Sequence, residues 1–183
     1  GLVTGISSIT TTPSTSVLSL SLKSDFYTDT SIGTITFAGD SEATGSNVID
    51  LSLLSGTPAM SITGSAGIDT ITLGAGVDTV DTGTGVINDI VAVAVIGDLG
   101  TSSAVVDSLA AGGGTADALQ IGTGAAITVP DTMDFTTKVT GFEKITAVAT
   151  GGIISITPHA TLVTDTSIAS IDLSGDTNAT GSN

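Results

Sequence analysis

The sequence lacks cysteine and arginine altogether, and it contains only three lysines and one histidine. A fold without cysteine cannot depend on disulfide bonds. With 18 acidic residues and a net charge of -15, the chain has too little positive charge to bind phosphate groups, which argues against nucleic acid as a partner. The longest apolar run, residues 90–96, is far shorter than the roughly 20 residues of a membrane-spanning helix, so we expect no transmembrane segment.

Residues that favour helices are also scarce. Lys and Glu are few, and every acidic residue except Glu42 and Glu143 is Asp, whose short side chain favours turns. The 24 glycines, with abundant Thr, Ser, Val and Ile, are typical of short strands joined by tight turns. Because 40% of the residues are hydrophobic, we expect the chain to fold rather than remain disordered. The composition therefore predicts an all-β protein.

Two consecutive nonapeptides, GSAGIDTIT and LGAGVDTVD, share one pattern. Asp69 and Asp78 occupy the same position in a glycine-rich turn, and a β-branched residue, Ile71 or Val80, follows each Asp two residues later. Two such nonapeptides would make one coil of a parallel β-roll, with two turns and two short strands. The pattern therefore predicts a β-helix-like solenoid in which Ile71 and Val80 point inward.

The pattern extends upstream in weaker form. The segment GSNVID resembles GSAGID at an offset of 19 residues, which places Asp50 beneath Asp69. Apolar residues also recur at intervals of nine, at Leu53, Ile62, Ile71 and Val80. We expect Ile62, Ile71 and Val80 to stack in one inward column.

The next turn downstream, TGTGVINDI, departs from the pattern. It keeps Gly83 and Gly85 but has Ile87 at the position of the Asp. Because Asn88 and Asp89 follow immediately, this turn is either degenerate or carries a short insertion.

The glycine–aspartate turns are suited to binding a hard cation. Ca²⁺ takes six to eight oxygen ligands from carboxylates, backbone carbonyls and water. Glycine allows backbone angles closed to other residues, so carbonyl oxygens can converge within a turn. Turns two nonapeptides apart are expected on the same side, with an ion between them. The alternative is that Asp69 and Asp78 are turn residues that bond only their own backbone.

Residues 64–81 resemble the G-G-x-G-x-D-x-U-x calcium repeats of repeats-in-toxin (RTX) proteins. The resemblance implies a parallel β-roll in which turn carbonyls and the Asp hold Ca²⁺. Carried over to this sequence, the metal-ligand set is Gly64, Ala66, Gly67, Asp69, Leu73, Ala75, Gly76 and Asp78, with Gly83, Gly85, Asn88, Asp89 and Asp50 as weaker members. Gly64-Ser65 and Leu73-Gly74 stand where the family has paired glycines, so we expect a few ions and not a long column.

A second repeat is much longer. TDTSIGTITFAGDSEATGSN, ending at Asn47, returns as TDTSIASIDLSGDTNATGSN, ending at Asn183, and 19 of the 47 residue pairs at this offset of 136 are identical. We interpret 1–47 as the end portion of a repeat module, 48–136 as the nonapeptide segment, and 137–183 as the start of the next copy. This organisation favours a tandem array, with an internal duplication inside one self-contained domain as the alternative.

One helix and several further strands are expected outside the nonapeptides. The segment SSAVVDSLAA, residues 102–111, predicts a short helix that begins at Ser102 or Ser103 and ends before Gly112 to Gly114. Alternating apolar residues predict further strands at 17–22, 32–37, 153–156 and 168–173.

The composition of the chain and sequence segments such as VTGFEKITAV also resemble those of RTX-type bacterial S-layer proteins and large secreted adhesins. The resemblance implies an extracellular, cell-surface structural repeat (an S-layer, adhesin stalk or fibre) that folds and self-assembles with Ca²⁺. Its partners would be neighbouring copies, with cell-surface polysaccharide as a further candidate. The sequence contains no HExxH or GxSxG motif, so we do not expect an enzyme. The alternative is a calcium β-roll appended to a type I secreted exoenzyme or toxin.

Overall fold

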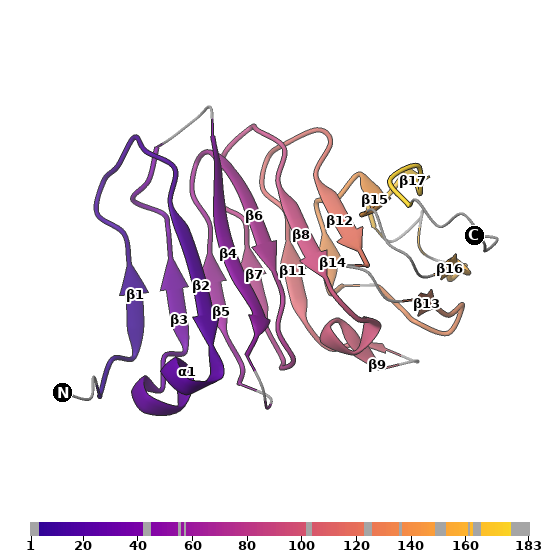
Figure 1. Ribbon diagram of the computed structural model, residues 1–183. Coiled ribbons are helices and arrows are strands. Elements are labelled where there is room, and N and C mark those ends of the chain that lie inside the picture. Colours follow the sequence, from indigo (N-terminus) through magenta and orange to yellow (C-terminus); the bar gives the residue numbers. More distant parts are fainter. Residues whose placement is uncertain are drawn as a thin grey trace.

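The chain forms a parallel β-solenoid, in which successive coils stack along one axis from the N-terminal to the C-terminal end (Figure 1). The computed structural model describes residues 4–41, 45–54, 56, 58–101, 104–122, 126–135, 137–148, 153–160, 162 and 166–176, with the backbone alone at 29 and 30. The all-β solenoid predicted from the turns and the alternating apolar residues is confirmed.

Two large parallel sheets form the walls of the solenoid. The six-stranded sheet stacks β1 (Ser8–Thr10), β3 (Thr34–Thr36), β5 (Ser61–Thr63), β7 (Thr79–Asp81), β11 (Ser108–Ala110) and β14 (Val139–Thr140). The seven-stranded sheet stacks β2 (Ser19–Lys23), β4 (Ser46–Leu53), β6 (Ile68–Thr72), β8 (Ile90–Val93), β12 (Ala118–Ile121), β15 (Lys144–Ala147) and β17 (Ser170–Asp172). The chain alternates between the two sheets until β15.

Smaller elements lie on the connections between these strands. Strands β13 (Ile127–Val129) and β16 (Ile154–Ile156) form a parallel pair, and β9 (Gly100–Thr101) and β10 (Ala104–Val105) form an antiparallel one. The helix α1 (Ser24–Thr30) follows β2, and the 3₁₀ turn η1 (Ile96–Asp98) follows β8. None of the described helices is long and apolar enough to cross a membrane.

The core consists of columns of apolar side chains, one residue from each coil. In the six-stranded sheet the registers place Ile9, Ile35, Ile62, Val80, Leu109 and Val139 in one column. In the seven-stranded sheet they place Leu20, Ile49, Ile71, Val91, Leu119, Ile145 and Ile171 in another, although Ile171 in the last strand is exposed. Such continuous burial of apolar area is the main source of stability for a stacked-coil fold.

The apolar spacing of nine predicted this core only in part. Ile71 and Val80 do point inward, as expected. However, Ile62 stacks on Val80 in one sheet, whereas Ile71 belongs to the opposite sheet, because successive nonapeptides form opposite walls of the same coil. Leu53 lies at the end of β4 and is 53% exposed, since the inward positions of this longer strand are filled by other residues.

The helix predicted at 102–111 is wrong. Residues 102 and 103 lie outside the described residues, but Ala104–Val105 and Ser108–Ala110 are the strands β10 and β11. Leu109 fills the core column between Val80 and Val139, so tertiary pairing overrides the helical tendency of the segment. The structure instead has a helix at α1, which ends at Thr30 and is followed by Ser31 in a left-handed conformation.

The 136-residue repeat is visible in the structure. Strands β1 and β3 pair with the same register as β15 and β17, since Ile9 faces Ile35 and Ile145 faces Ile171. The following turn also recurs, because the N–H of Asp40 donates to Phe37 O and that of Asp176 to Leu173 O. The two copies nevertheless lie in different walls: β1 and β3 belong to the six-stranded sheet, and β15 and β17 to the seven-stranded one.

Candidate functional site

The coils turn at two corners, and the two nonapeptides supply one turn to each. The first corner leads from the six-stranded sheet into the seven-stranded one and contains residues 64–67. The second corner leads back and contains residues 73–76. The structure therefore separates the predicted ligands Gly64, Ala66, Gly67 and Asp69 from Leu73, Ala75, Gly76 and Asp78.

Turns stack closely at the first corner, as the two-nonapeptide spacing predicted. Gly83 has a φ of 111°, and a Cβ at this position would collide with the carbonyl oxygen of Ser65 in the preceding coil. A Cβ at Gly85 would likewise collide with Ala66 O, and Gly113 N–H in the next coil donates to Gly85 O at 2.9 Å. Glycine is thus needed where the backbone of one coil contacts that of the next.

A row of polar side chains runs along the first corner, where each chain segment enters the seven-stranded sheet. We call it the first ladder, and it contains Asn47, Asp69, Asp89, Asp117 and Glu143. Three consecutive contacts repeat one arrangement, in which a carboxylate accepts the backbone N–H of the ladder residue one coil before. The distances are 2.8 Å from Asp69 N to Asp89 Oδ1, 2.6 Å from Asp89 N to Asp117 Oδ1 and 2.9 Å from Asp117 N to Glu143 Oε2.

The N-terminal end of the first ladder is a buried network of side chains. Asn47 Oδ1 accepts Leu18 N–H at 2.8 Å, and Asn47 Nδ2 donates to Asp40 Oδ2 and to Ser65 Oγ. The backbone N–H and the hydroxyl of Ser65 both donate to Asp69 Oδ2, at 2.8 and 2.9 Å. Asp69 therefore does bond its own turn, as the alternative interpretation required, while its backbone N–H is bound by the next coil.

The second corner carries a shorter row with the same arrangement, the second ladder, formed by Asp78 and Asp107. Met60 N–H donates to Asp78 Oδ1 at 2.9 Å, and Asp78 N–H donates to Asp107 Oδ1 at 2.8 Å. Both carboxylates are buried. Asp98 of η1, also buried, lies close enough to repel their negative charges.

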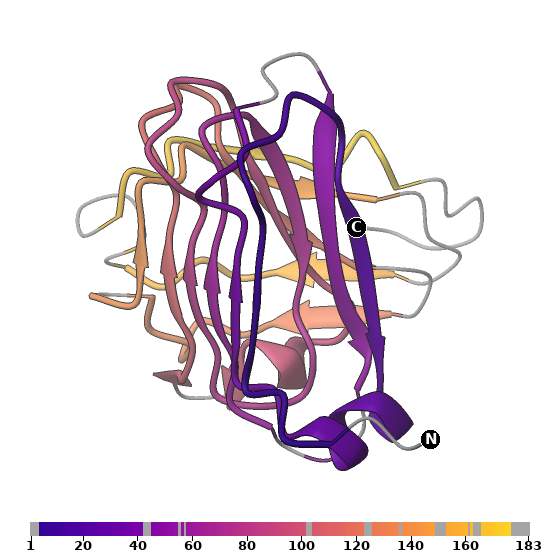
Figure 2. The ribbon, with the colours of Figure 1, turned by 90° about the vertical axis from the view of Figure 1, so that its left-hand side faces the viewer.

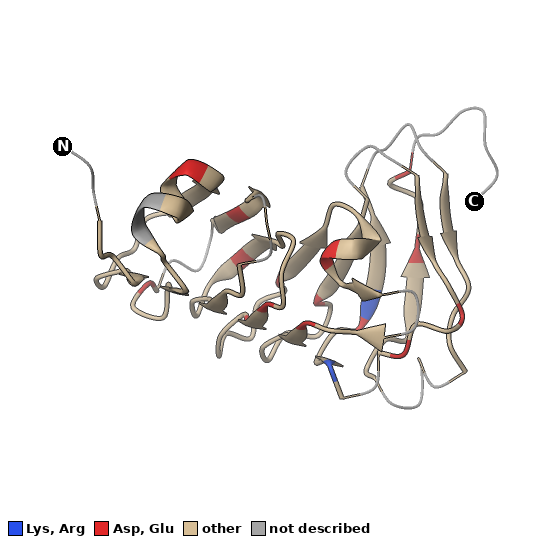
Figure 3. Cartoon of the chain, turned by 90° about the horizontal axis from the view of Figure 1, so that it is seen from below, with Lys and Arg blue, Asp and Glu red and all other residues tan. Residues whose placement is uncertain are grey.

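Burial raises the pKa of four ladder carboxylates, those of Asp69, Asp78, Asp89 and Asp107. Removal from water raises the pKa of Asp78 and of Asp89 to about 6 and that of Asp107 to about 7, although backbone or side-chain hydrogen bonds oppose the shift in each case. Burial also raises the pKa of Asp69. Acidic residues recur along the stack of coils whereas lysine is sparse (Figure 3), and within the described part no lysine forms an ion pair with a ladder carboxylate.

Several buried carboxylate oxygens also lack a hydrogen-bond partner among the described residues. They are Asp69 Oδ1, Asp107 Oδ2, Asp117 Oδ2 and Asp40 Oδ1. At Gly64 the position of an absent Cβ is surrounded by oxygens, Thr82 O from the next coil and Asp69 Oδ2 at 2.9 Å. Carboxylate and carbonyl oxygens are the donors that Ca²⁺ prefers. No three Asp, Glu or His side chains converge on a metal position among the described residues, so an ion here would need backbone carbonyls and water.

The weaker predicted ligands have different positions. Asp50 does not align with Asp69, because the β4–β6 register pairs Asp50 with Thr72 and Asn47 with Asp69. Its Oδ1 accepts the nearby Ser52 N–H. Asn88 is exposed and its Oδ1 accepts the N–H groups of the next turn, whereas Asp89 is the ladder residue. The third turn thus carries an insertion.

Sequence reasoning missed Asn47, Asp107, Asp117 and Glu143. The signal that could have found them is local: a glycine lies two to four residues before each of the first-ladder residues, and a buried apolar residue follows each by two positions. The missed residues precede Ile49, Leu109, Leu119 and Ile145 in this way. The search for a fixed period of nine overlooked them because successive ladder residues are separated by 20 to 29 positions.

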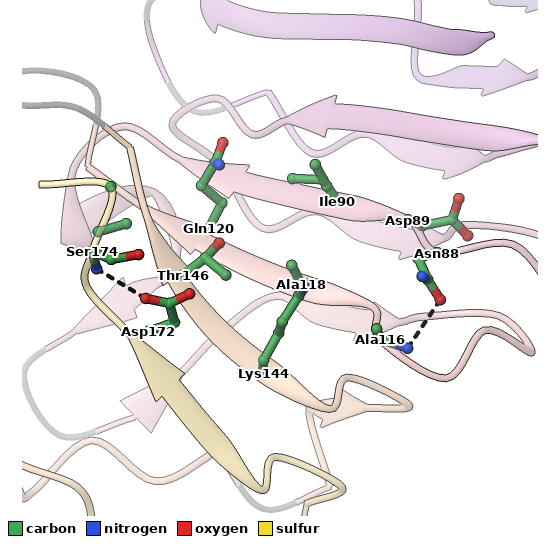
Figure 4. A pocket seen from close by; sticks show the side chains of 12 residues that line it. Asn88, Asp89, Ile90, Ala116, Ala118, Gln120, Lys144, Thr146, Asp172 and Ser174 are labelled. Atoms are coloured by element: carbon green, nitrogen blue, oxygen red, sulfur yellow. Dashed lines mark hydrogen bonds between the residues drawn. The ribbon is translucent and has the colours of Figure 1, made fainter.

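A groove of about 340 Å³ lies beside the first ladder on the outer face of the seven-stranded sheet (Figure 4). Strands β8, β12, β15 and β17 form its floor, with Gln120, Lys144, Thr146 and Asp172 among the residues that line it. At its ends Asn88 binds Ala116 N–H and Asp172 binds Ser174 N–H. The groove is lined by polar and apolar residues alike and carries charges of both signs.

Comparison with known proteins gives no assignment, since no protein-family model, curated protein or solved structure matches the chain.

Proposed function

We propose that this chain is a structural repeat of a secreted cell-surface protein, and that Ca²⁺ bound along its corner ladders stabilises it. The observation that carries the proposal is the two rows of buried carboxylates, Asp69–Asp89–Asp117 and Asp78–Asp107. In the described part of the chain one oxygen each of Asp69, Asp107 and Asp117 has no hydrogen-bond partner, and the positive charge that acts on these rows is Lys138, which lowers the pKa of Asp107 against the larger effect of burial. Buried negative charges at adjacent levels of a solenoid repel one another, and a hard cation removes that repulsion.

The ligands would combine the two kinds of oxygen present at each corner. At the first corner these are the Asp69 carboxylate and turn carbonyls, including that of Thr82 near Gly64. At the second corner Asp78 Oδ1 and the Pro58 carbonyl both lie near the position of a Cβ on Gly76. Since each site combines turns from different coils, it does not exist in the unfolded chain, and cation binding is coupled to folding.

A structural role is supported by the architecture. The β1–β3 pair recurs as the β15–β17 pair with the same register, and stacked repeats present ends that neighbouring repeats can cover. The proposal therefore includes association with further copies. It also includes an extracellular location, where calcium modules bind with dissociation constants of about 10⁻⁴–10⁻³ M.

The test is a Ca²⁺ titration of the chelator-treated chain, followed by circular dichroism and by urea unfolding. We expect the unfolding midpoint to rise with Ca²⁺ in the range of about 10⁻⁴–10⁻³ M and much less with Mg²⁺. Asp69→Asn and Asp78→Asn should each weaken the response, while Asp131→Asn at an exposed turn serves as the control. An identical unfolding midpoint in chelator and in Ca²⁺ would contradict the proposal and leave the ladders as purely structural.

A further inference from the structure

Among the described residues, none covers the N-terminal end of the solenoid. Figure 2 views the molecule from this end, where β1, β2 and α1 lie nearest the viewer. In the described part of the chain β1 pairs only with β3, and β2 only with β4, so each strand has one free edge. Ile6, Ile9 and Leu18 pack against the core at this end but remain only partly buried.

The second copy of the repeat shows the same positions in a covered state. The counterparts of Ile6, Ile9 and Leu18, 136 residues later, are Phe142, Ile145 and Ile154. Their side chains are 0%, 1% and 0% exposed. The three positions are apolar in both copies, and the second copy has a coil upstream that covers them.

The covering coil consists of β12 and β13. Strand β12 pairs with β15, with Leu119 opposite Ile145 and Gln120 opposite Thr146. Strand β13 pairs with β16, with Thr128 opposite Ser155. Backbone bonds extend this contact beyond the strands, since Lys144 N–H donates to Asp117 O and Ile127 N–H donates to Ile153 O.

We propose that the free edges of β1 and β2 form a docking surface for the β12–β13 end of another copy of this repeat. The register follows from the 136-residue offset: Leu119 of the upstream copy would face Ile9, Gln120 would face Thr10, and Thr128 would face Ser19. The contact closes the apolar end, and it pairs strand edges that would otherwise be free to associate in other ways.

The chemistry of the surface permits this contact. The charged pair Glu143 and Lys144 of the internal junction is replaced by Ser7 and Ser8, so both charges are lost together. Within the chain the backbone N–H of Asp117 donates to the Glu143 carboxylate. In the proposed contact the Asp117 N–H of the upstream copy would face Ser7 of the downstream copy, whose hydroxyl is also an acceptor. The inference deepens the self-association part of the proposed function, but it needs only the repeat and no bound cation.

The copy that docks on the free edges of β1 and β2 must have its own β12 and β13 uncovered. In this chain β15 and β16 cover them, so a second separate molecule could dock only after releasing its residues 137–183. The natural occupant is therefore the module directly upstream in a tandem arrangement.

The experiment uses a chain in which an extra copy of residues 1–136 precedes the complete sequence. Because the protein contains no cysteine, Gln120→Cys in the upstream copy and Thr10→Cys in the downstream copy introduce the only thiols. Directly paired strands lie about 4.8 Å apart, within the Cα separation that a disulfide requires. Gln120→Cys with Thr146→Cys in the 183-residue chain is the reference pair, and Gln120→Cys with Ser8→Cys in the tandem chain is the control shifted by two residues.

In Ca²⁺-containing buffer we expect the Gln120–Thr10 pair to cross-link as fully as the reference pair and about tenfold more than the shifted control. Absence of this cross-link while the reference pair forms would overturn the inference, as would equal cross-linking of the shifted control. Small-angle scattering of the cysteine-free tandem chain is a second measurement: one continuous rod supports the inference, and two bodies joined by a linker overturn it. Repeating the reference pair in chelator tests the proposed calcium function separately.

Discussion

The backbone N–H of Asp69 donates to the carboxylate of Asp89 at 2.8 Å, which ties together two coils twenty residues apart in the sequence. Both residues are buried. The same donor and acceptor arrangement joins Asp89 to Asp117 in the following coil. Each ladder carboxylate thus satisfies a backbone group that the corner would otherwise leave without a partner.

We predict that Asp89→Ala lowers the free energy of unfolding by about 1–3 kcal/mol, because the buried Asp69 N–H loses its acceptor. Asp89→Asn should cost less, since its amide oxygen can still accept the bond. Urea unfolding of both variants, with exposed Asp131→Ala as the control, measures the difference. Equal losses for Asn and Ala would show that the negative charge matters and not the acceptor.

Stability of the cation-free chain should fall as pH rises. The pKa of Asp107 is raised to about 7, and those of Asp78 and Asp89 to about 6, so the folded state binds these protons more tightly than the unfolded state does. The stabilisation is complete below the pKa of an exposed Asp, about 4, and is lost as pH rises through about 6 to 7. Urea unfolding in chelator between pH 5 and pH 8 measures this loss.

A matched variant isolates one group in this pH dependence. Asp107→Asn keeps an oxygen that can accept the Asp78 N–H, but the side chain cannot titrate. The free energy of unfolding of this variant should therefore change with pH by about 1–3 kcal/mol less than that of the wild type over the same range. A wild-type chain that becomes more stable as pH rises would refute the role assigned to the buried carboxylates.

Two glycine substitutions should differ sharply. Gly83→Ala places a Cβ against the Ser65 carbonyl at a φ of 111°, so the stacked turns must separate. We expect a loss of more than about 2 kcal/mol. Gly97→Ala meets nothing within 4 Å and should change stability by less than about 1 kcal/mol. Thermal unfolding of both variants compares them directly, and a tolerated Gly83→Ala would mean that the turns are not stacked as described.

The apolar columns predict a further contrast. Ile71→Ala opens a cavity between Ile49 and Val91 and should cost about 2–5 kcal/mol. Leu53→Ala, at an exposed position, should cost less than about 1 kcal/mol. Denaturant unfolding distinguishes the two outcomes, and similar losses would place Leu53 in the core after all.

The nonapeptide pattern predicted much of the fold because it describes one coil completely. In residues 64–81 each corner is short, so the period of nine correctly placed Ile71 and Val80 inside and stacked the turn at Gly64 beneath that at Gly83. The alternating strands near both ends of the chain were also confirmed, for instance β3 and β16.

Prediction failed where connections between corners vary in length. Asp107 follows a connection that contains η1, β9 and β10, so its position in the second ladder is set by pairing with a distant coil. The same pairing turned the expected helix at 102–111 into strands. Asp50 was misassigned for a related reason, since the true offset between its strand and the next is 22 residues and not 19.

The hydrogen bonds of the corner ladders stabilise the solenoid independently of the number of residues in each coil. Successive ladder residues are joined by the same N–H to carboxylate bond whether they are 20 or 28 positions apart in the sequence. Insertions and deletions in the connections can therefore accumulate during evolution without disturbing the axis of the fold. Distant relatives of such a protein would preserve the order of corner residues while losing any common repeat length, and alignment by fixed spacing would fail to find them.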